Sequence, residues 1–312
     1  MKLLNDRANC PSCNFNNCKQ LLKLNWDNKI LFSFFEYRNY PKNYIKEAAY
    51  VLMECDRCGL IYQRYSPNDK LSNEIYNNWI VKRRTANIKD YSFNPFSVQN
   101  TIRNISEIHQ LINFSLKKPS QLKVLDFGMG WGGWCKAAQL MGLEAYGTEI
   151  NKKQIEYFKT QGLKVIDWKE IPDYNFDIIN INQVLEHVPN PSLIISHVKK
   201  GLTFDGIIKI GVPDAQNIKS NLKKDFQSQW FYAKGESYSL NPVEPLQHLN
   251  AFNYKALKYI MSQHGFQHLE QPVGNYYNDS INTLSLKNIL YSIARRLIPT
   301  RYRTELVFKY SL

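Results

Sequence analysis

The stretch Leu122-Lys-Val-Leu-Asp-Phe-Gly-Met-Gly-Trp-Gly-Gly133 decides the fold of this chain. Residues 122–127 are mostly apolar and end on an acid and an aromatic residue, which predicts a short buried strand. Gly128 and Gly130 follow at once, and residues 134–142 have the apolar spacing of a helix. A strand, a glycine turn and a helix in this order bring free backbone N–H groups close to a ligand.

The residues that follow repeat the alternation of strand and helix. The predicted strands are 144–149, 163–166, 176–182 and 206–214, and a helix is predicted near 191–201. Such alternation predicts a doubly wound, parallel α/β sheet that binds its ligand at the carboxyl ends of the strands.

Acidic residues stand at the ends of the first three predicted strands. Asp126 precedes the glycine turn, where its carboxylate is expected to meet a ligand amino group. Glu149 comes about twenty residues after the glycines, which is the place of a ribose-binding carboxylate in a βαβ nucleotide site. Asp167, followed by Trp168, comes directly after the third strand.

Four cysteines form two CxxC pairs near the N-terminus. Cys10-Pro-Ser-Cys13 and Cys55-Asp-Arg-Cys58 are separated by about forty residues. Four thiolates complete the tetrahedral shell of Zn²⁺ and leave no open position, so the pattern predicts a structural zinc ribbon. The long spacer predicts an insertion that contains strands. The alternatives are unrelated cysteine pairs or redox CxxC motifs.

Three motifs together resemble those of class I S-adenosylmethionine-dependent methyltransferases that act on small molecules. They are VLDFGMGWGG (124–133), YGTEI (146–150) and FDIININQVLEHVPNP (176–191), within a region of resemblance that covers roughly residues 120–272. With the CxxC pairs, the resemblance extends to zinc-ribbon methyltransferases that modify sugars, often nucleotide-linked ones. It implies a Rossmann-like sheet of seven strands, with the last strand, 305–310, antiparallel. A dinucleotide-dependent dehydrogenase is the main alternative, but the LEHV segment has no role in its fingerprint.

The resemblance also implies a role for each motif residue in binding S-adenosylmethionine. Asp126, Gly128 and Gly130 would hold the methionine part, and Asn182 and Gln183 would lie beside it. The remaining residues would contact the nucleoside. Glu149 would accept hydrogen bonds from the two ribose hydroxyls, and Ile150 would pack on the adenine. Asp167 and Trp168 would border the adenine.

Two histidines are candidate general bases for methyl transfer, because the transfer is an in-line displacement and a hydroxyl or carbon acceptor must lose a proton. His187 follows the fourth strand, and His248 lies in the long connection 213–252. In the resembled family the corresponding histidine follows a glutamate and faces the substrate. Gln247 stands there in this chain, so His248 is expected to lack a carboxylate neighbour. Both histidines could instead be structural, and the aromatic residues of the connection could form a lid core.

The net charge of +13 points to an anionic partner. Residues 1–120 carry 18 Lys and Arg against 10 Asp and Glu, residues 121–280 carry 16 of each, and residues 281–312 carry six against one. The surplus therefore lies in the flanks, where the phosphates of an activated sugar are the first predicted partner and nucleic acid the second. The basic run 82–84 is one candidate contact, and the amphipathic stretch 284–303 offers a weaker case for a membrane surface.

The sequence therefore predicts a zinc-ribbon region (1–75), a helical linker (76–120) and a methyltransferase domain (121–312). No stretch approaches the roughly 18 apolar residues of a membrane span, and the first residues lack a secretory core, so a cytoplasmic enzyme is expected. The predicted function is methylation of a small molecule, most simply a sugar. The alternatives are an RNA or protein methyltransferase that docks through the basic flanks, and a non-catalytic binding protein with the same fold.

Overall fold

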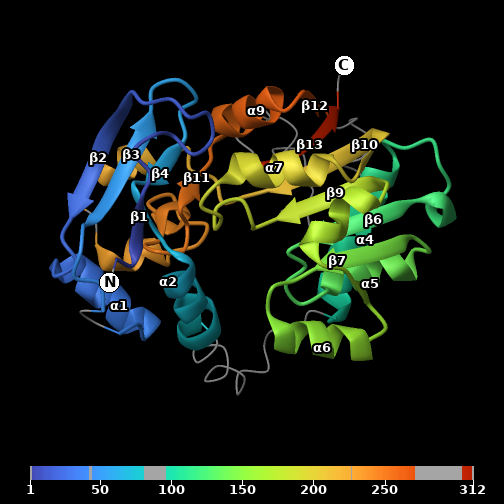
Figure 1. The fold of residues 1–312 in the computed structure, drawn as a ribbon, viewed down its shortest axis with the longest axis horizontal. Coiled ribbons are helices and arrows are strands. Elements are labelled where there is room, and N and C mark those ends of the chain that lie inside the picture. Colours follow the sequence, from blue (N-terminus) through green and yellow to red (C-terminus); the bar gives the residue numbers. More distant parts are fainter. Residues whose placement is uncertain (1, 42–43, 81–95, 226, 271–303, 311–312) are drawn as a thin grey trace, which may run out of the picture. The chain divides into compact units, whose positions relative to one another are not determined.

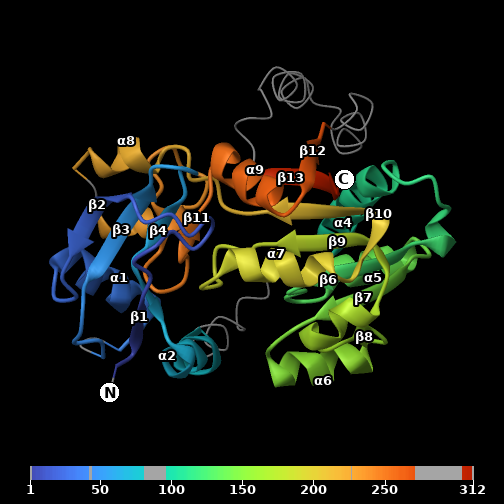
Figure 2. The same cartoon turned by 45° about the horizontal axis from the view of Figure 1, so that its top comes forward.

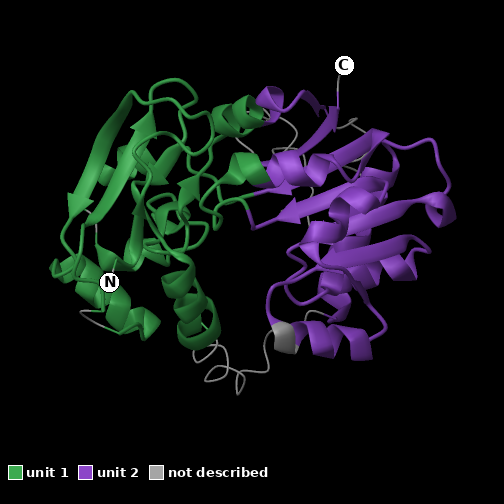
Figure 3. Cartoon of the chain, viewed as in Figure 1, with its two compact units in different colours: residues 1–93, 185–193, 212–260 green, residues 94–184, 194–211, 261–312 purple. Residues whose placement is uncertain are grey.

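The computed structural model describes residues 2–41, 44–80, 96–225, 227–270 and 304–310. The chain divides into two compact units (Figure 3). Unit 1 consists of residues 1–93, 185–193 and 212–260, and unit 2 of residues 94–184, 194–211 and 261–312. Neither unit is one continuous segment, because the chain passes from one to the other several times.

This division differs from the predicted boundaries at 75 and 120. The long connection belongs to unit 1, since its residues 250–251 form an edge strand of the N-terminal sheet. The basic run 82–84 and the stretch 284–303 lie outside the described residues.

Unit 2 is built on a seven-stranded sheet, which confirms the predicted α/β fold (Figure 1). The strand order is β12-β13-β10-β9-β6-β7-β8, in which β6 to β10 are parallel and β13 is antiparallel to both of its neighbours. The strands are β6 (Lys123–Phe127), β7 (Glu144–Thr148), β8 (Lys164–Val165), β9 (Phe176–Asn182), β10 (Leu202–Gly211), β12 (Phe266–Leu269) and β13 (Glu305–Tyr310). The last of these is the antiparallel strand that was expected at 305–310.

Helices connect the parallel strands, as the alternating pattern requires (Figure 2). The central strands β6 and β9 are buried along almost their whole length, because both faces of a parallel sheet are covered. Residues Ile108 of α4 and Ala137 of α5 pack with Val124 of β6 in one core cluster. The helices are α4 (Val98–Ile112), α5 (Gly133–Leu140), α6 (Lys152–Thr160), α7 (Pro191–Lys199) and α9 (Tyr254–Gln263), with short 3₁₀ turns η2 (Pro119–Gln121) and η3 (Trp168–Asp173).

Unit 1 contains a four-stranded antiparallel sheet in the order β11-β4-β3-β2 and a separate pair, β1 and β5. The strands are β1 (Leu4–Asp6), β2 (Cys18–Leu24), β3 (Tyr50–Cys55), β4 (Ile61–Gln63), β5 (Tyr65–Pro67) and β11 (Asn250–Ala251). The helical segments are α1 (Lys29–Arg38), α2 (Asp69–Glu74), the π-helical turn η1 (Ile75–Trp79), α8 (Ile218–Leu222), η4 (Ser228–Phe231) and η5 (Asn241–Val243). Strands β2 and β3 fall between the two CxxC pairs, and helix α1 lies between those strands.

The core of unit 1 is rich in aromatic side chains from distant parts of the chain. Phe34 of α1, Tyr50 of β3 and Phe231 of η4 are fully buried, and the ring centroids of Phe34 and Phe231 lie 5.4 Å apart. The connection 213–252 therefore supplies core residues to this unit. Within the described residues, no helix is long and apolar enough to cross a membrane.

Candidate functional site

The structure brings most of the predicted cofactor residues to one edge of the seven-stranded sheet. Gly128, Glu149, Asp167 and Gln183 each follow within two residues of the carboxyl end of β6, β7, β8 or β9. These strands are parallel, so their carboxyl ends meet at the same edge, which is where α/β folds bind ligands.

Two glycines of the turn after β6 differ in their surroundings. Both have left-handed backbones, with φ of 73° at Gly128 and 56° at Gly130. A Cβ on Gly128 would lie 2.7 Å from Cγ2 of Val184, whereas a Cβ on Gly130 would meet nothing within 4 Å. Packing thus requires glycine at position 128. The space beside Gly130 leaves the backbone open to a ligand.

Asp126 is buried in the sheet. The amide of Asn180 on the neighbouring strand donates a hydrogen bond of 2.8 Å to its Oδ1, and the Sγ of Cys135 lies 3.9 Å from its Oδ2. Burial raises the pKa of Asp126 to about 7. The carboxylate therefore already links β6 to β9, and its contact with a cofactor amino group stays a prediction.

Glu149 lies at the start of the connection to α6. Its Oε1 accepts hydrogen bonds from the backbone N–H groups of Ile150 (2.8 Å) and Asn151 (3.0 Å). Both hydrogen bonds use Oε1, so Oε2 is the oxygen that would accept a hydrogen bond from a ribose hydroxyl. Ile150 is 79% exposed, so it offers an apolar surface against which an adenine ring could pack.

Asp167 and Trp168 have local roles. Asp167 is the N-cap of η3: its Oδ1 accepts from the N–H of Lys169 at 2.9 Å, and Glu170 accepts from the N–H of Asp167 at 2.9 Å. Such reciprocal capping explains an acid here without a ligand. The ring of Trp168 lies 4.6 Å from that of His197, centroid to centroid. A role for this pair at the adenine stays a prediction.

Asn182 and Gln183 are exposed at the end of β9. Gln183 has φ 56°, an uncommon value for a residue with a side chain, and its N–H donates to the carbonyl of Gly211 at 2.7 Å. A Cβ at position 211 would lie 2.2 Å from Oδ1 of Asn182, so glycine there makes room for that amide. Strained backbone of this kind tends to occur at ligand sites.

The two candidate bases meet in unit 1 together with a carboxylate. Glu186, His187 and His248 each place a potential ligand atom within 4.8 Å of the others. Nε2 of His187 is 3.8 Å from Oε1 of Glu186, and the two imidazole centroids are 4.9 Å apart. His248 was expected to lack a carboxylate neighbour. The residue before it in the sequence is indeed Gln247, but the fold brings the carboxylate of Glu186 close to it.

The environment of this cluster disfavours charge. Burial raises the pKa of Glu186 to about 8, and burial lowers the pKa of His248 below its ordinary value. Neither oxygen of Glu186 has a hydrogen-bond partner among the described residues.

Both imidazoles are oriented by backbone carbonyls. Nδ1 of His187 is 3.0 Å from the carbonyl oxygen of Gln247, and Nδ1 of His248 contacts that of Asn241. A carbonyl only accepts, so each Nδ1 carries a proton, and Nε2 is the basic nitrogen of the neutral ring.

Two residues without any recognisable motif hold the loop that carries Glu186 and His187. The side-chain amide of Asn250 donates to the carbonyls of Leu185 (2.9 Å) and Val188 (2.7 Å). The guanidinium of Arg7 in turn donates to Oδ1 of Asn250 (2.8 Å) and to the carbonyl of Pro189 (3.1 Å). No sequence motif points to either residue; in the sequence, Arg7 contributes only to the net charge.

Gln247, which replaces the expected glutamate, belongs to a second buried network. Its amide donates to Oε1 of Glu244 at 2.6 Å and to the hydroxyl of Tyr40. Glu244 also forms an ion pair with Arg38. Burial raises the pKa of Glu244 to about 7, although Arg38 opposes the shift.

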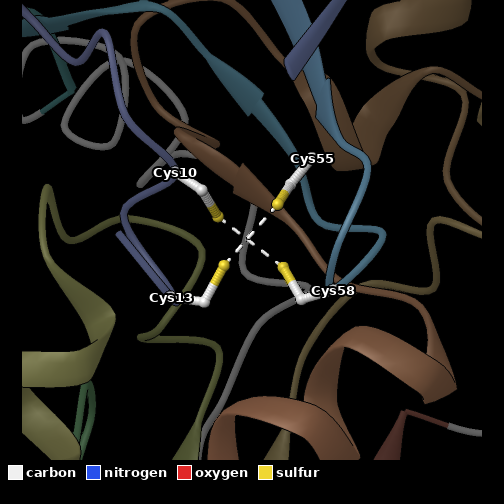
Figure 4. Close-up of side chains that lie close together, drawn as sticks. All are labelled: Cys10, Cys13, Cys55 and Cys58. Carbon is white, nitrogen blue, oxygen red and sulfur yellow. Dashed lines mark hydrogen bonds between the residues drawn. The ribbon is translucent and has the colours of Figure 1, made fainter. Parts of the chain in front are cut away.

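The four predicted zinc ligands lie together in unit 1. Figure 4 shows the sulfur atoms of Cys10, Cys13, Cys55 and Cys58 pointing toward one another. The Sγ atoms are 3.6 Å apart both in the Cys10–Cys58 pair and in the Cys13–Cys55 pair, and all four lie within 4.8 Å. Zinc–sulfur bonds of about 2.3 Å in a tetrahedron put sulfurs about 3.8 Å apart, so the set fits this ion.

A family model described as a methyltransferase domain matches residues 100–271. A ubiquinone biosynthesis O-methyltransferase of Actinobacillus pleuropneumoniae serotype 5b (strain L20) is 31% identical over 133 residues, which are 38% of this chain and 54% of that protein. One of Vibrio atlanticus (strain LGP32) is 25% identical over 154 residues, 44% of this chain and 61% of that protein. The matches thus span little more than half the length of these curated relatives.

Solved structures with a similar chain trace include two methyltransferases with SAH. The plantazolicin methyltransferase BpumL is 14% identical at a TM-score of 0.48, over 77% of this chain and 94% of that chain. The magnesium protoporphyrin IX methyltransferase ChlM from Synechocystis PCC 6803 is 15% identical at a TM-score of 0.48, over 78% of this chain and 100% of that chain. Identities and scores this low carry no conclusion about substrate.

Proposed function

Because the chain belongs to the methyltransferase domain family, we propose that it transfers a methyl group from S-adenosylmethionine to a small molecule. The observation that carries the proposal is the family match over residues 100–271. The open turn at Gly130, at the ligand edge of the sheet, supports it.

The residues at the sheet edge suit the parts of this cofactor. The open backbone at Gly130 would accommodate the methionine end, and Oε2 of Glu149 would accept the ribose hydroxyls. Ile150 would pack against the adenine, with Asp167 and Trp168 at its border. The cofactor, when bound, supplies an electrophilic methyl group on a sulfonium, and the chain contributes alignment of the acceptor with it.

Replacement of Glu149 by alanine tests this cofactor site. Loss of a charged hydrogen-bond acceptor costs about 1.5–3 kcal/mol, so the dissociation constant for S-adenosylmethionine should rise about ten- to a hundredfold in calorimetry. Glu144→Ala is the matched control, because Glu144 lies at the opposite end of the same strand, and it should bind normally. Unchanged binding by Glu149→Ala would exclude this site assignment.

For the proton of the acceptor we propose the histidine pair, with His248 as the first candidate and His187 as the second. Nε2 of His248 is the basic nitrogen of its neutral ring, and burial keeps that ring uncharged near neutral pH. His248→Ala should lower kcat by about 10²–10⁴-fold, the range for general bases, while the affinity for S-adenosylmethionine stays the same. His109→Ala, on α4 of unit 2, serves as the control. A normal kcat in His248→Ala would remove this role.

For the substrate we propose a sugar or a nucleotide-linked sugar. The support is the combination of paired CxxC motifs with the methyltransferase motifs, together with the basic flanks, whose charge suits phosphates. Incubation with labelled S-adenosylmethionine and a panel of nucleotide-linked sugars should give a methylated sugar detectable by mass spectrometry. Label transfer to RNA or protein, with none to any sugar, would contradict this substrate class.

The zinc site is a proposal of the same kind. Cys10, Cys13, Cys55 and Cys58 would hold one Zn²⁺ and leave no position for substrate, so the ion would stabilise unit 1 and take no part in the chemistry.

A further inference from the structure

Glu186 has no hydrogen-bond partner that would explain its burial. It is 0% exposed, and both carboxylate oxygens lack a hydrogen-bond partner among the described residues. This is unusual, because almost all buried polar groups have a hydrogen-bond partner. The charged contact that the structure gives it is Nε2 of His187 at 3.8 Å, which is longer than a hydrogen bond.

The two nearby histidines have the orientation found in metal ligands. Each imidazole directs Nδ1–H to a backbone carbonyl, His187 to Gln247 and His248 to Asn241. In metal sites such outer carbonyls fix the tautomer and leave Nε2 as the ligand atom. The third potential ligand, Glu186, lies within 4.8 Å of both rings' ligand atoms.

These distances are close to those of a bound ion. Metal–ligand bonds of about 2.0–2.2 Å in a tetrahedron put neighbouring ligand atoms about 3.3–3.6 Å apart, so atoms as much as 4.8 Å apart need to approach by up to about 1.5 Å. The backbone around them is held in place, since Asn250 and Arg7 satisfy the carbonyls of residues 185, 188 and 189. Small side-chain movements on a fixed loop are sufficient.

We propose that Glu186, His187 and His248 bind one divalent transition-metal ion, at a site separate from the four cysteines. Two imidazole nitrogens and one carboxylate oxygen suit Zn²⁺, Fe²⁺ or Co²⁺ and suit Mg²⁺ poorly, because Mg²⁺ prefers oxygen ligands. Three protein ligands leave at least one coordination position open, as in catalytic metal sites. The side chain of His187 is 26% exposed, so the site is not sealed.

The role of the ion rests on the proposed function. An acceptor hydroxyl bound at the open position would lose its proton more readily, because a divalent cation stabilises the alkoxide. An Nε2 atom bound to the ion cannot also accept a proton, so in the metal-bound chain His248 is a ligand and not the general base, while the methyl transfer proposed above is unchanged. The proton leaves to solvent, and the alkoxide oxygen forms the bond to the methyl carbon as the bond to sulfur breaks.

Metal analysis of the full chain tests the site without any assay of activity. After loading with Zn²⁺ and gel filtration, the wild type should contain two zinc ions per chain by mass spectrometry. Glu186→Gln, which preserves shape and removes the charge, should contain one. His109→Gln is the control and should contain two. One zinc per wild-type chain, or two in Glu186→Gln, would overturn the proposal.

Cobalt distinguishes the two sites by their ligands. The Co²⁺ ion bound by the four cysteines should produce intense thiolate-to-cobalt absorption. The Co²⁺ ion at Glu186, His187 and His248 should add only weak bands typical of nitrogen and oxygen ligands. The weak bands should vanish in Glu186→Gln and in His248→Gln. If they persist in both variants, the second ion lies elsewhere and the proposal fails. Thermal melting shows whether each variant folds. If one variant does not fold, the other still tests the site.

Failure of the site and failure of the proposed function give different results. If the second metal ion binds but the chain neither binds S-adenosylmethionine nor methylates anything, the function is wrong and the site stands. If methylation proceeds at the same rate with one zinc per chain, the function stands and the site is wrong.

Discussion

Gly130 and Gly142 are two glycines of unit 2 that share a left-handed backbone but differ in their position relative to the sheet. Their φ angles are 56° and 83°, and a Cβ on either would meet nothing within 4 Å. An alanine in this conformation costs about 1–2 kcal/mol, so Gly130→Ala and Gly142→Ala should lose similar stability in urea unfolding. Only Gly130 lies in the turn at the ligand edge.

Comparison of Gly130→Ala with Gly142→Ala therefore distinguishes the effect of backbone strain from the effect of lost contact with the ligand. Gly130→Ala should bind S-adenosylmethionine at least about tenfold more weakly, equal to about 1.4 kcal/mol, because its methyl group enters the space left for the cofactor. Gly142→Ala should bind as the wild type does. Equal affinities in calorimetry would show that the space beside Gly130 is not the cofactor site.

Asp126 should make the stability of the chain depend on pH. Burial raises its pKa to about 7, compared with about 3.9 in an unfolded chain. Between these values the folded state holds a proton that the unfolded state has released, so the contribution is complete below about pH 4 and is lost as the pH rises to about 7. Within that window the loss is about 1.4 kcal/mol per pH unit.

Asp126→Asn removes this proton and should flatten the pH dependence. The free energy of unfolding, measured in urea at pH 5, 6 and 7, should fall less steeply in the variant than in the wild type. Asp173→Asn changes an exposed acid of the same unit and should follow the wild type. Parallel curves for Asp126→Asn and the wild type would mean that this carboxylate ionises normally in the fold.

Among the secondary-structure elements, local sequence patterns predict the bounds of a strand well where the strand is buried along most of its length. Strand β9 has the bounds 176–182 that its local pattern predicts, and β13 has the bounds 305–310 that the family resemblance implied. Strand β10 begins at Leu202, four residues before the predicted start. Its first four residues are intermediate or exposed, so they lack the continuous apolar pattern of the buried part. Their strand geometry depends on pairing in the sheet.

The elements around the CxxC pairs show the limits of pattern alone. An insertion with strands was expected between the pairs, but helix α1 was not. The helix begins at an Asn28 cap and ends at Asn39, which adopts a left-handed conformation. Its fully buried Phe34 packs against Phe231, almost two hundred residues away. A helix this short is stabilised mainly by such tertiary packing.

At the scale of the whole molecule, the cysteine cluster should control the stability of unit 1. It links residues 10–13 to residues 55–58, and zinc bound to four thiolates contributes folding free energy directly. Removal of the metal by a strong chelator should lower the Tm of the zinc-loaded chain by about 10 °C or more, given about 2–4 °C per kcal/mol for a domain of this size.

Cys135 offers a control within the same chain. It is a buried thiol of unit 2 and does not belong to the four-cysteine cluster of unit 1, so Cys135→Ala should keep its zinc and its sensitivity to the chelator. Cys58→Ser should lose the zinc of the cysteine cluster and show a much smaller fall in Tm with chelator than the wild type. A wild-type chain that holds zinc yet melts at the same temperature with and without it would contradict a structural role for the ion.

Sequence patterns alone were enough to predict the doubly wound sheet, the glycine turn with its neighbouring acids and the grouping of four cysteines. These features depend on the period of apolar residues and on short spacings, which hold wherever the segment lies. Only the tertiary structure decided that Glu186 and His187 meet His248, and that Arg7 and Asn250 hold their loop. These residues are separated by tens to hundreds of positions, and their distances depend on how β11 and the loop after β9 pack, which no local pattern encodes.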